Sequence, residues 1–156
     1  MTHHLARLAV LALLAVLVAP QPAAAGGDWN DTGIAWQSYE EGLKKAKEDG
    51  KPICLIFYTN WCPHCTNYAK VFHDEAVVEK AKKFVMVRVD KDAHPAISSK
   101  FKPDGEYIPR TYFLSSDGVL DPALTENRPQ YKYFYNELDP ASILGGMDRA
   151  LAKLSK

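Results

Sequence analysis

Residues 53–65 read ICLIFYTNWCPHC, and this stretch decides the fold. Its first six residues form an unbroken apolar run, which is typical of a strand buried on both faces. Two cysteines follow closely, Cys62 and Cys65, and from Cys65 onward apolar residues recur at helical spacing. The stretch therefore predicts a buried strand that leads into a cysteine pair at the start of a helix. In an open α/β sheet, the end of a strand where the next helix begins is the usual place for chemistry.

The cysteine pair has the features of a redox site. Cys62 would lie at the helix N-terminus, where unpaired N–H groups and the positive end of the helix dipole favour the thiolate. Cys65, one turn further along, would be close enough to attack a mixed disulfide formed at Cys62. Pro63 suits the first helical turn, where its missing N–H leaves no bond unmade. His64 would add a hydrogen-bond donor, or a charge when protonated, beside the Cys62 sulfur. We predict that these four residues are catalytic.

Other uses of the cysteine pair remain open at this point. A structural zinc site needs four ligands, and only Cys54 and scattered histidines could join the pair. The signature of c-type haem attachment is missing because Thr66, not histidine, follows Cys65. We therefore predict no metal and no cofactor, and we expect Cys54 to pack in the core. A metal carrier and a redox-inactive, chaperone-like binding module remain the alternatives.

Helical and strand patterns surround the pair. Ser38 and Glu41 form a capping box at a helix start, and Gly50 is placed to end that helix. Asp139 followed by Pro140 predicts the start of another helix. In chain order, the predicted elements are a helix over 38–49, a strand over 53–58, a helix from 65, a helix over 76–82, strands over 84–89 and 111–114, a hairpin return strand at 119–120 and a helix over 139–151. This order predicts an α/β fold.

With these motifs in place, the chain resembles the thioredoxin superfamily from Trp36 to Lys153. The resemblance is carried by the segment 61–65, by Ile108-Pro109 and by the order of the elements. Within that superfamily, segments 103–110 and 131–135 resemble the small endoplasmic-reticulum proteins of the anterior-gradient type. The Pro-His dipeptide between the cysteines is instead similar to that of bacterial periplasmic disulfide oxidants of the DsbA type.

The resemblance implies a thioredoxin fold, with a central mixed β-sheet flanked by helices. It implies that Cys62 is the nucleophile and that Cys65 is the resolving cysteine. It also implies that Pro109 is a cis proline that faces the two cysteines across a substrate groove. We predict Trp61, Ile108 and Pro109 as substrate-binding residues, Trp61 because it adjoins the nucleophile and would shape the partner surface.

The chain departs from the family pattern in two places. Thioredoxins carry a buried acidic residue six positions before the first cysteine, where this chain has Ile56. Proton transfer from Cys65 would then rely on water or another group. The chain ends in 153–156 without the retention tetrapeptide of the reticulum proteins. We therefore expect an exported protein of a bacterial periplasm, with secretion or the reticulum lumen as lesser alternatives.

The N-terminal residues predict export. An unbroken apolar run, Leu8–Ala19, is followed by small residues in an Ala-x-Ala pattern. We predict a cleaved signal peptide over 1–25, a flexible leader over 26–35 and a thioredoxin-like domain over 36–156. The formal net charge is +0, so nothing favours binding to nucleic acid. We expect no stable membrane insertion after cleavage and a monomer.

Together these patterns predict a thiol–disulfide oxidoreductase that exchanges disulfides with cysteine-containing exported proteins. An unidentified redox partner would recharge the site. His64 favours the oxidase direction over the reductase direction, because stabilising the reduced thiolate makes the disulfide a stronger oxidant. Tyr131, Tyr133 and Tyr135 recur at period two and could form a strand face or a substrate-binding wall, with packing favoured.

Overall fold

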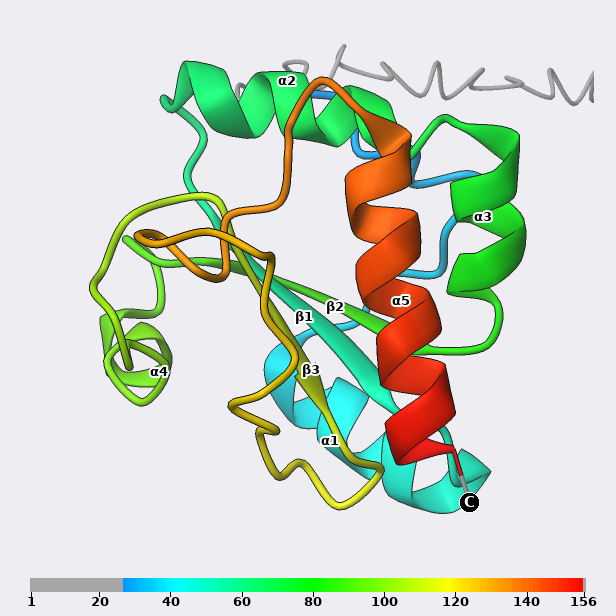
Figure 1. Ribbon diagram of the computed structural model, residues 1–156. Helices are drawn as coiled ribbons and strands as arrows, with labels where there is room; N and C mark the ends of the chain where they lie inside the picture. Colours follow the sequence, from blue (N-terminus) through cyan, green and yellow to red (C-terminus); the bar gives the residue numbers. More distant parts are fainter. Residues whose placement is uncertain (1–26, 156) are drawn as a thin grey trace, which may run out of the picture.

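The computed structural model describes residues 27–155, and Figure 1 shows its elements. The predicted signal peptide over 1–25 lies outside the described residues. In chain order the elements are α1 (Tyr39–Asp49), β1 (Ile53–Tyr58), α2 (Pro63–Val71), α3 (Glu75–Ala81), β2 (Val85–Asp90), α4 (Pro95–Ser98), β3 (Arg110–Leu114) and α5 (Pro140–Leu154). Within residues 27–155, no helix is long and apolar enough to cross a bilayer.

The three strands form one mixed sheet in the order β2-β1-β3. β1 pairs with β2 in parallel and with β3 in antiparallel orientation, which confirms the predicted α/β fold with a central mixed sheet. Residues 53–57 of the central strand are all buried. This burial explains why β1 reads as a continuous apolar run and does not alternate between apolar and polar residues.

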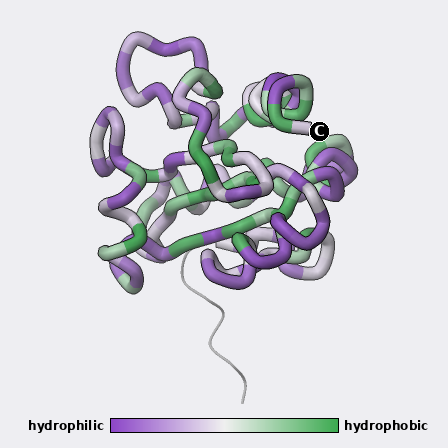
Figure 2. The backbone as a smooth tube through the Cα atoms, turned by 90° about the horizontal axis from the view of Figure 1, so that it is seen from below, coloured by the Kyte–Doolittle hydropathy of each residue, from purple (hydrophilic) through white to green (hydrophobic). Residues whose placement is uncertain are grey.

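Side chains of β1 alternate between two apolar cores, one on each face of the sheet. Cys54 and Ile56 lie in the core shared with α2, α3 and α5, whereas Ile53, Leu55 and Phe57 lie in the core shared with α1 and the α4 region. Figure 1 shows α3 and α5 on one side of the strands and α4 on the other. In Figure 2, hydrophobic stretches run through the middle of the molecule and many outer loops are hydrophilic.

The helix ends follow the predicted capping signals. The Ser38 hydroxyl accepts from the backbone N–H of Glu41 at 3.3 Å, and Gly50 closes α1 with a φ of 66°, a conformation that favours glycine. The Asp139 carboxylate accepts from Ala141 N–H at 2.9 Å. These caps use contacts within one helical turn, so the sequence contains the whole signal. α5 runs on to Leu154, beyond the predicted end at 151.

The segment predicted as a flexible leader is packed from residue 27 onward, so the prediction over 26–35 is wrong there. Trp29 is 2% exposed, and its ring lies 5.6 Å from that of Phe72. The Trp29 carbonyl accepts from the Trp36 indole N–H at 2.8 Å, and Ile34 is also buried. The prediction rested on the polar, glycine-rich composition of the segment and overlooked Trp29, whose ring packs against α2.

The predicted hairpin return strand is also wrong. Leu120 makes only an isolated bridge with Leu114, and 119–120 forms no strand. Pro122 follows closely, and because proline has no backbone N–H it cannot continue a ladder.

The three tyrosines do not form one strand face. Tyr133 and Tyr135 are buried, one in each core, which confirms packing for these two. Tyr131 is 51% exposed and has a φ of 53°. A residue with positive φ leaves the extended backbone of a strand, so the period-two pattern does not correspond to a strand here.

Replacing Trp29 with alanine should lower the free energy of unfolding by about 3 kcal/mol, the usual cost of truncating a buried aromatic side chain. Urea unfolding followed by circular dichroism measures this loss. Trp61→Ala is the matched control, because the Trp61 side chain is 70% exposed and its loss should cost less than about 1 kcal/mol. Equal destabilisation by both variants would contradict a packed segment.

Candidate active site

Cys62 lies at the junction between β1 and α2. β1 ends at Tyr58, and Cys62 takes the N-cap position of α2 with φ −83° and ψ 117°. Pro63 is the first helical residue, as predicted. The backbone N–H of Thr66 donates to the Cys62 carbonyl at 3.1 Å, so the helix begins directly behind the thiol. The Cys62 sulfur is thereby placed at the positive end of the α2 dipole.

The two cysteines of the motif differ in burial and in environment. Cys62 is 4% exposed and Cys65 is 0% exposed, and both are free thiols in this structure. Burial raises the pKa of the Cys65 thiol strongly, a backbone hydrogen bond from Thr59 opposes this rise, and the neighbouring Cys62 and Glu137 add to it. Cys65 therefore remains a thiol at neutral pH, beside the less buried Cys62.

The His64 imidazole is held by Glu137, a residue from the loop before α5. Its Nδ1 lies 2.9 Å and 2.8 Å from the two carboxylate oxygens of Glu137. The same carboxylate accepts from the Asn67 side chain at 3.1 Å. Among the hydrogen bonds of residues 27–155, none joins His64 to Cys62. The expected donation from His64 to the Cys62 sulfur is therefore not observed, and Nδ1 is bound to the Glu137 carboxylate instead.

Trp61, which directly precedes Cys62, is exposed to solvent. Its side chain is 70% exposed, but its indole N–H donates to the Asp92 carboxylate at 2.8 Å. This hydrogen bond, followed by those from Lys91, lowers the pKa of the Asp92 carboxyl. Trp61 is thus an exposed aromatic ring fixed in place, which suits the predicted contact surface for a partner.

Ile108 and Pro109 approach the cysteines from β3. The peptide bond between them is cis, as the resemblance implied. Phe57 of β1 pairs with Arg110, so Pro109 lies at the end of β1 from which the chain continues to Cys62. Ile108 packs against the core cluster that contains both motif cysteines. The structure therefore brings all the predicted site residues to one end of the sheet.

Arg110 was missed by the sequence analysis, yet it is completely buried. Its guanidinium donates to the Tyr107 carbonyl at 2.9 Å and to the Ser98 hydroxyl at 2.7 Å. It also lies 4.9 Å from the centre of the Phe57 ring. Arg110 thereby ties the loop before Pro109 to α4 and β1. An arginine between a proline and a short strand carries no sequence signal for such burial.

Glu137 is the other residue that sequence reasoning missed. Its side chain is only 12% exposed, although it lies in a polar loop 73 residues from His64. No local pattern connects two residues at that separation, because the contact exists only once α5 has packed beside α2.

A hollow of about 560 Å³ opens beside this histidine. Its lining residues, which come from α2 and the loop before α5, are His64, Glu126, Arg128, Phe134, Asn136, Glu137 and Leu138. Arg128 stacks over the Phe134 ring at 4.9 Å, and Leu138 is 75% exposed. The hollow therefore offers both apolar and charged surface next to the cysteine motif.

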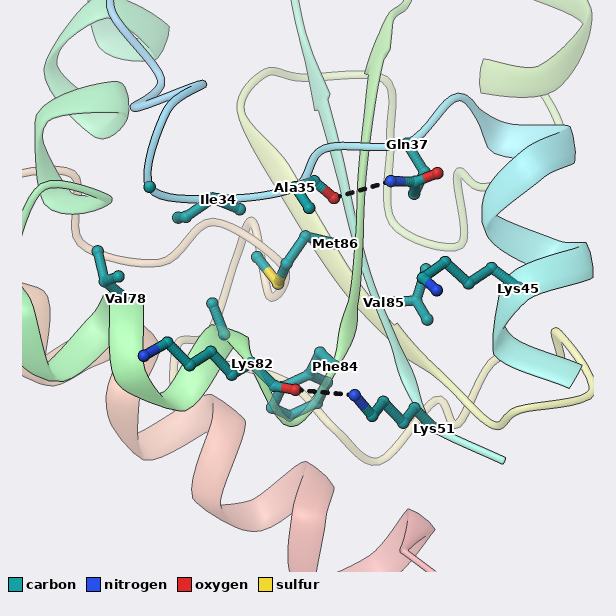
Figure 3. A pocket seen from close by; sticks show the side chains of 12 residues that line it. Ile34, Ala35, Gln37, Lys45, Lys51, Val78, Lys82, Phe84, Val85 and Met86 are labelled. Atoms are coloured by element: carbon teal, nitrogen blue, oxygen red, sulfur yellow. Dashed lines mark hydrogen bonds between the residues drawn. The ribbon is translucent and has the colours of Figure 1, made fainter. Parts of the chain in front are cut away.

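A second hollow of about 270 Å³ lies between α1, α3 and β2, and none of the cysteines lines it (Figure 3). Its floor includes Met86 and Phe84, and lysines stand at its edge. The Lys51 side chain donates to the backbone carbonyl of Lys82 at 3.1 Å, so it joins the loop after α1 to the C-terminal end of α3. We assign this hollow no part in cysteine chemistry.

Cys54 is fully buried in β1, and burial raises its pKa strongly. It packs as a small apolar side chain, as predicted. Within residues 27–155, no three His, Cys, Asp or Glu side chains gather as a metal-binding group.

Comparison with known proteins agrees with this geometry. The family model described as Thioredoxin-like matches residues 35–116. The human anterior gradient protein 2 homolog is 32% identical over 127 residues, which cover 81% of this chain and 71% of that protein.

Solved structures share the fold. A thioredoxin from Thermus thermophilus has a TM-score of 0.62 and 20% identity, covering 78% of this chain and 89% of that chain. A structure described as DsbH oxidoreductase has a TM-score of 0.57 and 22% identity, covering 88% and 93%. At such identities these structures show the common fold alone. Together with the sequence matches, they confirm the predicted resemblance: the chain belongs to the thioredoxin-like family, with anterior gradient proteins among its relatives.

Proposed function

We propose that the protein is an exported thiol–disulfide oxidoreductase that exchanges disulfides with cysteine-containing exported proteins. One observation carries this proposal: Cys62 caps α2, while Cys65 lies fully buried beside it. Only Cys62 can meet a bulky partner, and only Cys65 is placed to resolve the mixed disulfide. Membership of the thioredoxin-like family supports the same chemistry. The apolar run Leu8–Ala19 supports export, with a bacterial periplasm as the proposed compartment.

In the oxidising direction, a substrate thiolate attacks the Cys62 sulfur and breaks the Cys62–Cys65 bond. Cys65 leaves with the electron pair and takes up a proton, which its buried position favours. A second substrate thiolate then attacks the substrate sulfur of the mixed disulfide and releases Cys62. The substrate loses two electrons, the Cys62–Cys65 disulfide gains them and becomes the dithiol, and a redox partner removes them to restore the disulfide. The reducing direction runs these steps backwards.

Trapping tests the roles of the two cysteines. Cys65→Ser should accumulate mixed disulfides with partner proteins, because the attacking sulfur remains and the resolving sulfur is gone. Cys62→Ser should abolish exchange. Non-reducing gels and mass spectrometry detect the adducts, and Cys54→Ala, which removes the third thiol, should exchange normally. Adducts formed by Cys62→Ser in place of Cys65→Ser would reverse the assignment.

Alkylation of the reduced protein tests the asymmetry directly. Iodoacetamide reacts with the thiolate form of cysteine. An ordinary cysteine has a pKa of about 8.5. Because burial raises the pKa of Cys65, this residue should stay protonated between about pH 6 and about pH 9. Peptide mass spectrometry should find Cys62 modified first throughout this range, with Cys65 and Cys54 labelled only after unfolding. Labelling of Cys65 at the rate of Cys62 would contradict the structure.

The reduction potential decides the direction of exchange. We propose the oxidase direction because Cys62 lies at the N-terminus of α2, where the helix dipole stabilises the thiolate and makes the disulfide a stronger oxidant. This direction requires a potential towards roughly −120 mV, the value of a strong periplasmic oxidant. Equilibration of the Cys62/Cys65 pair with glutathione measures it. A potential near roughly −270 mV would identify a reductase, and failure to cycle at all would favour the redox-inactive binding module.

A further inference from the structure

The contact between Glu137 and His64 dictates which ring nitrogen is available for chemistry. An ionised carboxylate can only accept hydrogen bonds. The Nδ1 of His64, which lies 2.8 Å from Glu137 Oε2, must therefore carry a hydrogen and donate it. The orientation of a histidine and its proton position are commonly fixed in this way by a carboxylate. Among the hydrogen bonds of residues 27–155, none uses the other nitrogen, Nε2, which is left for proton exchange.

The His64 imidazole lies at the protein surface. The His64 side chain is 62% exposed and borders the hollow of about 560 Å³ described above, whereas Glu137 is largely buried behind it. The titratable and charged groups around the imidazole are Glu137, Glu126 and Arg128 of the hollow, together with the adjacent thiols of α2.

The site also lacks the buried acidic residue that transfers protons in thioredoxins. Ile56 is fully buried at the strand position where an acidic residue assists thioredoxins. Exchange at neutral pH is nevertheless assisted when a proton is given to a basic departing sulfur or taken from an incoming thiol. A histidine held by a carboxylate, two residues from the attacking cysteine, is suited to this proton transfer on the surface side of the site.

We propose that His64 is the general acid–base of this site and that Glu137 is its positioning residue. The proposal rests on the proposed oxidoreductase function. When the Cys62 thiolate attacks a substrate disulfide, the new bond forms between Cys62 and one substrate sulfur, and the substrate S–S bond breaks. The other substrate sulfur leaves with the electron pair and receives the proton from Nε2 of the imidazolium. His64 is left neutral, and its Nδ1 keeps its hydrogen and still donates it to Glu137. In the reverse step, neutral Nε2 takes the proton from a substrate thiol.

Two disulfides with different leaving groups distinguish a general acid–base role of His64 from an effect of His64 on the reactivity of the Cys62 thiolate. An aromatic disulfide that releases nitrothiobenzoate has a weakly basic leaving sulfur, which gains little from a general acid. An aliphatic disulfide such as hydroxyethyl disulfide has a strongly basic leaving sulfur, which gains much more. The reduced protein is mixed with each disulfide in excess, and the rate of the first attack by Cys62 is followed by stopped flow and by mass spectrometry.

His64→Ala should slow the aliphatic reaction on the order of 10²-fold, the usual contribution of a general acid, and leave the aromatic reaction near the wild-type rate. Glu137→Ala should slow the aliphatic reaction roughly ten-fold, as loss of an orienting carboxylate does at comparable histidines. Glu137→Gln should recover part of that loss, because its amide oxygen still accepts from Nδ1. Glu48→Gln removes an exposed carboxylate on α1 and should change neither rate.

Equal slowing of both disulfides by the His64 and Glu137 variants would overturn the proposal, because it would indicate a changed Cys62 nucleophile or a damaged fold. Unchanged aliphatic rates would overturn it as well. If Glu137→Gln reacted as slowly as Glu137→Ala, the result would contradict the proposal that the hydrogen bond from Nδ1 orients His64. Failure of the proposed function looks different, since the wild-type protein would then react with neither disulfide.

Discussion

Burial of β1 on both faces is the constraint on which the rest of the structure depends. Its side chains supply both cores, and its two edges bind β2 and β3. A strand enclosed in this way can present chemistry only where it ends. Here the end delivers Cys62 to the N-terminus of α2 and places Pro109 alongside, because β3 runs antiparallel to β1. The position of the site is thus a consequence of the core, and a shift in the β1 register would displace the site.

The same burial makes the two sulfurs unequal. Cys65 faces the core of α2, α3 and α5 and has lost its contact with water, so its charged form is disfavoured in the low-dielectric interior. Cys62 stands one turn earlier, where the helix end and the surface begin. In the proposed exchange, a single helical turn separates the sulfur that would meet partners from the sulfur that would resolve the mixed disulfide. The geometry and solvation of the two thiols suit these proposed roles.

Local signals in the sequence were sufficient for much of the fold. The Ser38 cap, the Gly50 stop and the apolar run of β1 each depend on neighbours a few residues away, and the structure confirms them. Trp29 and Glu137 were missed because each contacts residues from distant segments, Trp29 the Phe72 ring and Glu137 the His64 imidazole. The return strand at 119–120 was predicted from turn residues alone, although Pro122 limits pairing there. Caps, turns and strands that depend on neighbouring residues can be predicted from a sequence, whereas contacts between distant segments cannot.

The two exposed side chains that flank Cys62 share one structural device. Trp61 is held by Asp92 and His64 by Glu137, each through a hydrogen bond of 2.8 Å to a carboxylate from another loop. Side chains exposed at 70% and 62% would otherwise sample several rotamers, and ordering them on binding would cost about 0.5–1.5 kcal/mol each. The carboxylates impose that order before a partner arrives. Under the proposed exchange, such an ordered surface does not depend on close complementarity to any one cysteine-containing segment, because the sulfur exchange itself would supply the bond that holds the partner.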